Sequence, residues 1–272
     1  MVSKVVQKFI FPALGLLFII LLFWTYYASQ DTSYTLLQAQ KTYQAADDAP
    51  TIIQLSKDLN DVLRSYSYLE EQYNPMHGNG KLYNNIAATY FDLEQYPWAA
   101  LYFYQAQALG PRNEVIEQNL QKTLAKLNLP ARPKDSIFRK VFFFHFYLSL
   151  PERLQILSGL TLLLFALSSL FLWKRVPVLK GLIAAVIMLW TIFFCSVIYT
   201  KYFEPLEGVI VKDSMLYRSA AYGASFVAPK PIIGGSKVEV LDVLEDGKWL
   251  KIRNPDGIIG FIPSDSTRVL RT

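Results

Sequence analysis

Two uncharged apolar runs, joined by a short basic connection, constrain the fold of this chain more than any other feature. The first run covers Ile156–Trp173 and the second covers Gly181–Tyr199, which are 18 and 19 residues long. As helices that rise about 1.5 Å per residue, such runs reach roughly 27 Å and match the hydrocarbon core of a bilayer. A hairpin buried in a soluble protein is the alternative, but core helices rarely run so far without a polar face. The sequence therefore predicts a transmembrane hairpin over residues 155–200.

The connection between the two runs predicts the orientation of the hairpin. Residues 174–180 contain Lys174, Arg175 and Lys180 and no acidic residue. Short loops rich in Lys and Arg face the cytoplasm. The regions before and after the hairpin are therefore expected on the same, non-cytoplasmic side of the membrane.

The charge distribution agrees with a membrane protein. Charged residues make up 18% of the chain, below the roughly 25% of an average soluble domain. The formal net charge of +5 comes from residues 1–28 (+2) and 137–203 (+6), whereas residues 29–136 carry −3 and residues 204–272 are neutral. Positive charge beside a membrane sets topology and meets anionic lipid. No basic stripe marks a soluble region, so binding of nucleic acid is not expected.

The N-terminal residues predict a further membrane segment. Phe9–Tyr27 is an uncharged apolar run that follows Lys4 and Lys8. A cleaved signal has an apolar core of about 7–15 residues and small residues before the cleavage site. Here the run is longer and ends in bulky Tyr26 and Tyr27, which favours a retained signal-anchor helix over residues 1–28. A cleaved signal is the alternative, and either one places residue 29 onward outside the cytoplasm.

Residues 29–129 are predicted to form a helical domain, because apolar residues recur at helical spacing. The most specific stretch places large and small residues at fixed intervals: Tyr83, Ile86, Ala87, Tyr90, Ala99, Phe103, Ala106 and Pro111. This pattern resembles the tetratricopeptide repeat, a helix-turn-helix unit of about 34 residues. One repeat cannot bury its own face, so an upstream partner is required, with Tyr34–Ala46 and Ile52–Tyr73 as candidates.

The resemblance implies a concave groove for peptides or partner helices, lined by the first helix of the repeat. The residues expected in that groove are Lys81, Asn84, Ala88, Phe91 and Asp92. The alternative is that these side chains are only solvated surface.

Residues 130–154 are predicted to be a linker followed by an interfacial segment. Two prolines stiffen residues 129–134, and residues 142–147 gather aromatic rings beside Arg139 and Lys140. Aromatic rings favour the headgroup level of a membrane. A ligand-binding aromatic box is the sharper alternative.

Past Lys201 the apolar period changes to two, which predicts a small all-β domain over residues 204–272. Val238 and Val240 alternate with polar residues, as do Leu250 and Ile252, and turn signals separate these short runs. The segment resembles a bacterial SH3-like barrel. That resemblance implies a groove for peptides or cell-wall peptide stems, and its expected aromatic residues are Tyr217, Trp249 and Phe261. The alternative is that these rings simply close the barrel.

No catalytic, cofactor-binding or metal-binding residues are predicted. The chain has no glycine-rich phosphate loop and no histidine placed to activate a serine or cysteine. His77 and His145 are far apart and lack further ligands at metal spacing, and the single cysteine, Cys195, lies in an apolar run. The sequence therefore predicts a protein that is not an enzyme.

The order of parts resembles the BatE family of bacterial aerotolerance (Bat) operons, over nearly the whole chain. The resemblance implies a multi-pass protein of the bacterial inner membrane with both soluble domains in the periplasm. It further implies work beside membrane proteins with von Willebrand A domains and a MoxR-type ATPase, without catalysis. The first hypothesis is a scaffold for protein–protein interaction in a complex for aerotolerance or envelope stress. The second is an envelope anchor or sensor that binds peptidoglycan through the barrel.

Overall fold

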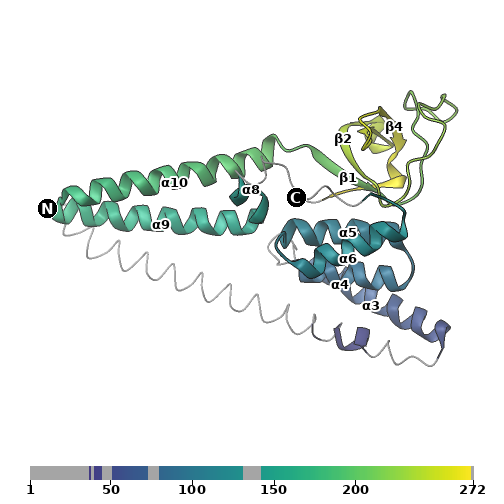
Figure 1. The fold of residues 1–272 in the computed structure, drawn as a ribbon, viewed down its shortest axis with the longest axis horizontal. Coiled ribbons are helices and arrows are strands. Elements are labelled where there is room, and N and C mark those ends of the chain that lie inside the picture. Colours follow the sequence, from purple (N-terminus) through teal and green to yellow (C-terminus); the bar gives the residue numbers. More distant parts are fainter. Residues whose placement is uncertain (1–36, 38–39, 45–50, 73–79, 131–141, 271–272) are drawn as a thin grey trace. The chain divides into compact units, whose positions relative to one another are not determined.

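The computed structural model describes residues 37, 40–44, 51–72, 80–130 and 142–270 (Figure 1). The chain divides into two compact units, residues 1–74 and 75–272. The predicted anchor over residues 1–28 lies outside the described residues, as do His77 and residues 131–141 of the predicted linker. In chain order the elements are α3 (Ile52–Gln72), α4 (Lys81–Asp92), α5 (Tyr96–Leu109), α6 (Glu114–Lys126), α8 (Phe143–Tyr147), α9 (Leu150–Lys174), α10 (Pro177–Tyr202), β1 (Leu206–Ile210), β2 (Lys237–Leu244), β3 (Trp249–Arg253), β4 (Ile259–Pro263) and β5 (Thr267–Val269).

The first unit contains α3, which confirms the helix expected over Ile52–Tyr73 to within one residue. Its buried side chains are spaced three or four residues apart, or lie side by side, as on one face of a helix: Leu59, Val62, Leu63, Tyr66 and Leu69. The opposite face carries polar side chains such as Lys57 and Arg64.

In the second unit, α4, α5 and α6 pack consecutively against one another. The large and small residues singled out in the sequence form the contact, because Tyr83 and Ile86 of α4 and Ala99 and Phe103 of α5 are buried. Pro97 stands in the first turn of α5, where a missing backbone N–H costs no helical hydrogen bond. The predicted helix-turn-helix is therefore present.

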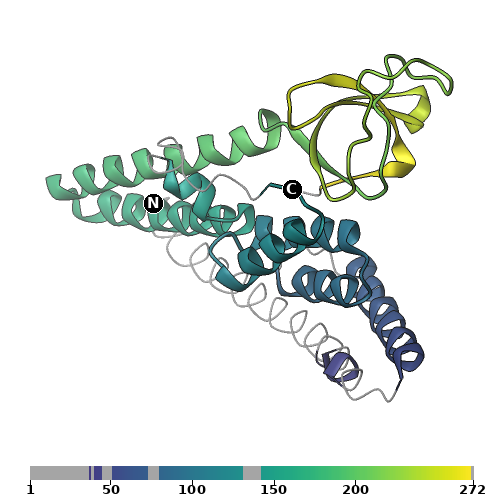
Figure 2. The same ribbon diagram turned by 45° about the vertical axis from the view of Figure 1, so that its right-hand side comes forward.

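α9 and α10 form an antiparallel hairpin (Figures 1 and 2). α9 begins with a capping box: the Ser149 hydroxyl accepts from Glu152 N, and the Glu152 carboxylate accepts from Ser149 N. α10 begins at Pro177, whose fixed φ suits a first helical turn. Only Arg175 and Val176 separate the helices, so the connection is shorter than the predicted loop over 174–180.

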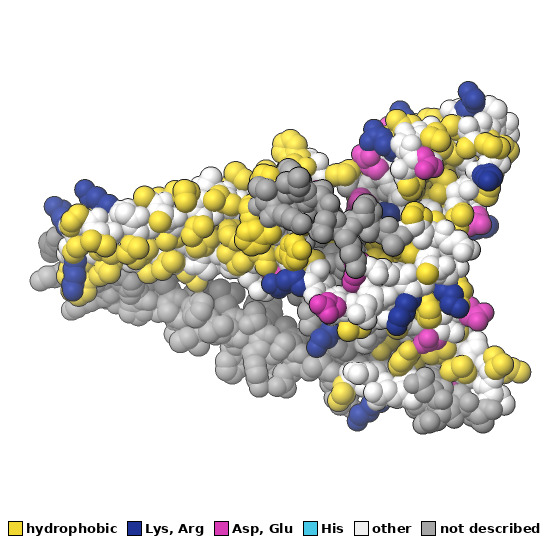
Figure 3. Space-filling model, viewed as in Figure 1, with side chains coloured by type: hydrophobic (Ala, Val, Ile, Leu, Met, Phe, Trp, Pro, Cys, Tyr) yellow, Lys and Arg dark blue, Asp and Glu magenta, His cyan; other side chains and the backbone are white. Residues whose placement is uncertain are grey.

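The surface of the hairpin is apolar. α9 buries only Arg153 among its 25 residues, and α10 buries Leu179, Val186, Ser196 and Thr200 among 26. Figure 3 shows hydrophobic side chains along the visible face of the hairpin and Lys and Arg side chains at its tip. Both helices are long and apolar enough to cross a membrane.

The five strands form one antiparallel sheet in the order β4-β3-β2-β1-β5. The predicted alternation is borne out in the register, which pairs Val240 with Ile252 and Leu250 with Ile262. These four side chains are buried in the core of the sheet. Sequence analysis did not anticipate β1 and β5, which pair with each other.

The helical segment and the sheet share an apolar core. Ala99, Ala100 and Phe103 of α5 cluster with Val209 of β1 and with Leu270 after β5. Gly235 lies within this contact at a φ of +87°, and a Cβ there would lie 2.3 Å from Leu127 Cδ1. The segments that were predicted as separate domains therefore meet closely.

Candidate functional site

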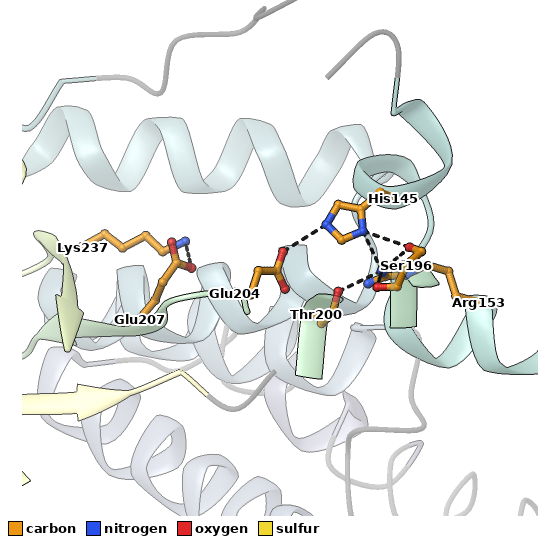
Figure 4. Close-up of polar contacts among 7 residues, drawn as sticks. All are labelled: His145, Arg153, Ser196, Thr200, Glu204, Glu207 and Lys237. Carbon is orange, nitrogen blue, oxygen red and sulfur yellow. Dashed lines mark hydrogen bonds and ion pairs between the residues drawn. The ribbon is translucent and has the colours of Figure 1, made fainter. Parts of the chain in front are cut away.

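A cavity of about 430 Å³ lies where α5, the ends of the hairpin and the first two strands meet. Its polar lining includes the side chains of Gln105, His145, Arg153, Glu204, Glu207 and Lys237. Figure 4 shows five of these side chains, together with Ser196 and Thr200 of α10. The charged and hydrogen-bonding side chains gathered in its lining make this cavity the candidate site.

Arg153 is the central side chain of the site and is only 4% exposed. Its Nη1 donates to Ser196 Oγ and to Thr200 Oγ1, both at 2.9 Å, and to the Ser196 carbonyl oxygen at 3.3 Å. Ser196 and Thr200 are four residues apart, so they share one face of α10. The guanidinium therefore ties the first turn of α9 to the end of α10.

His145 of α8 connects this arginine to a carboxylate. Its Nδ1 lies 2.9 Å from Arg153 Nη1 and its Nε2 lies 3.3 Å from Glu204 Oε1. A guanidinium only donates, so Nδ1 accepts and the ring proton sits on Nε2, which donates to Glu204. This hydrogen bond is the main reason that the pKa of Glu204 is held below its ordinary value.

An ion pair lies at the other side of Glu204 in Figure 4, between Lys237 of β2 and Glu207 of β1. Lys237 Nζ also lies 5.4 Å from the centre of the Tyr104 ring, within range of a cation–π contact. The cavity therefore combines two permanent cations and two carboxylates with one histidine.

Two residues of the cavity lining each carry one buried side-chain atom that has no hydrogen-bond partner within the described part of the chain. These atoms are Nε of Arg153, a donor, and Oε1 of Gln105, an acceptor. Gln105 is only 6% exposed, so bulk water does not reach its side chain freely. Both atoms are buried from the cavity as well, so a molecule in the cavity would not reach either of them.

The contacts also resemble part of a catalytic relay, because Ser196 Oγ lies 2.9 Å from His145 Nδ1. Arg153 donates to both of these atoms, however, and so occupies the lone pair that a general base would need. Ser196 is buried on α10 as well. This geometry holds the helices together and does not activate the serine. Among the described residues, no group of three or more His, Cys, Asp or Glu side chains is placed to hold a metal ion.

The predicted groove residues lie along α4 and do not belong to the cavity lining. Lys81 and Asp92 are exposed near the two ends of α4, whereas Asn84, Ala88 and Phe91 are half-buried. The Phe91 ring packs edge-on against Tyr96 of α5, with ring centres 5.2 Å apart. At helical spacing these positions follow one side of α4.

The predicted aromatic residues of the sheet do come together. Tyr217 and Phe261 exchange backbone hydrogen bonds of 2.8 and 2.9 Å, and the Tyr217 ring lies 5.4 Å from Trp249. Trp249 is only 2% exposed, however. The exposed rings of this cluster are Tyr222 (77% exposed), which packs on Trp249, and Phe226, which packs on Tyr217. Sequence analysis missed both, since they lie in the long connection between β1 and β2.

Sequence analysis also missed the cavity. One local feature of the sequence could have pointed to the cavity: the charged residue Arg153 stands just ahead of an uncharged apolar run. Ionisable groups in membrane helices often mark functional positions. A comparison with models of known protein families and with curated proteins finds no match for this chain.

Proposed function

We propose that this chain is a non-enzymatic membrane scaffold whose hairpin holds two protein-binding segments at one surface of a bacterial inner membrane. The observation that carries the proposal is the hydrogen bonding of Arg153 to Ser196 and Thr200. It ties the start of α9 to the end of α10, so the flanking segments leave the hairpin at the same end. The opposite end carries Lys174, Arg175 and Lys180, which the positive-inside rule assigns to the cytoplasm.

Exposed aromatic rings support the membrane part of the proposal. Trp173 is exposed near the basic end of the hairpin, and Tyr199, Tyr202 and Phe203 are exposed near the other end. Aromatic side chains are enriched at both membrane–water interfaces, and two such belts flank a membrane-spanning hairpin. The exposed leucines and phenylalanines between them would then contact lipid rather than water.

The partner-binding segments of the proposal are a tetratricopeptide-type groove along α4 and an SH3-like sheet. The shared core of α5 and β1 keeps these segments adjacent. A partner that contacts both gains avidity from the high effective concentration of the second contact. The order of parts, as in the BatE family, favours membrane proteins with von Willebrand A domains and a MoxR-type ATPase as partners.

Topology mapping tests the proposal. Reporter fusions after Asn128, at Arg175 and at Thr272 should report outside, inside and outside, respectively. A cytoplasmic report at Thr272 would overturn it. A photo-crosslinking residue in place of Phe91 should then capture a membrane protein, whereas the same residue in place of exposed Gln118 of α6 should not.

Peptidoglycan binding through the sheet is the second candidate, supported by the exposed Tyr222 and Phe226. Replacing Tyr222 by Ala in the full chain should then lower binding to purified sacculi. Tyr68→Ala, at an exposed tyrosine of α3, is the matched control. Trp249→Ala is unsuited to this test because Trp249 is buried.

A further inference from the structure

We propose that α8 inserts its exposed phenylalanines among the acyl chains of the membrane leaflet on the non-cytoplasmic side. This position is deeper than the headgroup level that the sequence predicts for the aromatic residues 142–147. The contact adds to the two spanning helices and belongs to one leaflet only. The inference rests on the proposed membrane insertion of α9 and α10 and is independent of partner binding.

α8 lies against the hairpin and not beyond its end (Figures 1 and 2). The Phe144 ring packs on Phe193 of α10, with ring centres 5.8 Å apart. The His145 ring packs on Tyr199, nearer the end of α10, with ring centres 5.4 Å apart. The first residues of α8 are therefore the ones nearer to the basic tip of the hairpin.

Phe193 lies well inside the uncharged apolar run of α10. That run ends at Tyr199, six residues later. At about 1.5 Å per residue, Phe193 lies roughly 9 Å inside the end of the run. The neighbouring helix, α9, is uncharged too, from Leu154 to Trp173. If the hairpin spans a bilayer, the surroundings at the level of Phe193 are therefore hydrocarbon.

α8 has two different sides. His145 faces the hairpin, where its side chain is only 8% exposed and its Nδ1 lies 2.9 Å from Arg153 Nη1. The other side carries aromatic rings, because Phe143 is 61% exposed and Phe142, just before the helix, is 41% exposed. A helix with a polar side held in place and an apolar side left bare has the pattern of a segment that lies in a membrane.

The bare rings continue the exposed apolar surface of α10, which favours acyl chains as their partner. Leu189 stands one helical turn nearer the tip than Phe193 and is 44% exposed. Lipid that covers Leu189 therefore extends to the rings of α8. Residues 142–148 include no Lys, Arg, Asp or Glu, so this segment enters hydrocarbon without stripping water from a permanent charge.

A depth measurement in vesicles tests the proposal, and the native Cys195 provides the reference. Cys195 is the single cysteine of the chain, is exposed and stands two residues after Phe193. The full chain is labelled there with a fluorophore and reconstituted in phosphatidylcholine vesicles. A second full chain carries Cys195→Ser and Phe143→Cys and is labelled at position 143. Quenching is compared between lipids spin-labelled on the headgroup and lipids spin-labelled midway along the acyl chain.

Position 143 and Cys195 should give the same ratio of acyl-chain to headgroup quenching, with acyl-chain quenching the stronger at both. Two controls also carry Cys195→Ser. Tyr202→Cys, at an exposed position near the end of α10, should give the opposite order. Gln118→Cys, exposed on α6, should be quenched by iodide in the water and by neither lipid. Phe142→Cys provides a second position beside α8, should the melting temperature show that the first variant is misfolded.

Every other outcome contradicts a stated part. Stronger headgroup quenching or iodide quenching at position 143, together with acyl-chain quenching at Cys195, overturns this inference alone, because the rings then lie at the headgroups or in water. Quenching at position 143 by neither lipid nor iodide shows that protein, such as a second copy of the chain, covers α8, and this also overturns the inference. Iodide quenching at Cys195 without lipid quenching overturns the membrane proposal and this inference with it.

Discussion

α5 and α9 are both rich in apolar residues, yet they use those residues in opposite ways. In α5 the apolar side chains face inward, and Ala99, Ala100, Leu101 and Phe103 are almost fully buried. In α9 the single buried residue is Arg153, while leucines and phenylalanines are exposed along the helix. Burying apolar area stabilises α5 in water. A helix apolar all round that buries only a charge has the pattern of a membrane segment.

The comparison shows that apolar content alone does not tell which solvent a helix meets. The position of the polar residues does. Gln105 is a buried polar residue of the largely apolar α5, whereas Ser196, Thr200 and Arg153 form the connected interior of the hairpin. In lipid, helices associate through packing and interhelical hydrogen bonds. Lipid tails are as apolar as the helix surfaces, so the hydrophobic effect does not drive the helices together there.

The largest expected effect comes from a matched pair of phenylalanines. Phe103→Ala should lower the free energy of unfolding by about 3–5 kcal/mol, because it opens a cavity in the shared core. Phe165→Ala, at an exposed position of α9, should change it by less than about 0.5 kcal/mol. Unfolding of the full chain in detergent measures both. Equal losses of unfolding free energy in the two variants would show that α5 and α9 do not differ in how they use their apolar side chains.

A second prediction concerns the polar interior of the hairpin. Arg153→Met removes a charged donor from Ser196 and Thr200 and should lower the free energy of unfolding in detergent by about 2–3 kcal/mol. Lys174→Met, at the exposed far end of α9, is the control and should have little effect. If both variants unfold alike, the hairpin does not depend on its polar end.

Substitutions of two glycines test how closely the sheet packs on the helical segment in the shared core. Gly235→Ala and Gly223→Ala both place a side chain at positive φ, but only the first meets another side chain, that of Leu127. Gly235→Ala should therefore cost about 1–3 kcal/mol more than Gly223→Ala. Both variants carry the cost of a side chain at positive φ, so the difference between their thermal unfolding reports the contact with Leu127. Equal costs would show that the sheet is not packed closely on the helical segment.

The smallest expected effect is a dependence on pH. Because the pKa of Glu204 is lowered in the folded chain, its ionised form adds stability above its ordinary value of 4.5, and that stability is lost as the pH falls through the lower folded value. Glu204→Gln should reduce stability at neutral pH and match the unaltered chain in acid. Solvent screens this partly exposed carboxylate, so the difference should be small. Unfolding from neutral pH to about pH 3 measures it, with Glu114→Gln as the control.

Local patterns predicted the elements of this fold well. Uninterrupted apolar runs predicted α9 and α10, and the spacing of Tyr83, Ile86, Ala99 and Phe103 predicted the packing of α4 on α5. Sequence analysis missed β1 and β5, because Gly208 interrupts the apolar residues of β1 and because β5 has only three residues. Such short strands form because their neighbours provide hydrogen bonds, which no local period reveals.

The candidate site was not predictable in the same way. Arg153 meets Ser196 and Thr200 across 43 and 47 residues of chain, and His145 meets Glu204 across 59. Apart from Arg153, each of these residues alone looks like an ordinary polar residue near the end of a helix. Their association depends on the register in which the two antiparallel helices pair, and no residue type or spacing in the sequence specifies that register.

The shared core has a consequence for how this protein is made. Leu270 packs in the same cluster as Ala99 and Phe103, and its backbone N–H bonds to Glu207, yet the entire hairpin is synthesised between these two parts of the core. Contacts so distant in sequence form late, because the intervening chain must first be organised. If the hairpin crosses the membrane, the core closes only after both crossings are complete, so maturation of the helical segment is timed by translocation of the C-terminus.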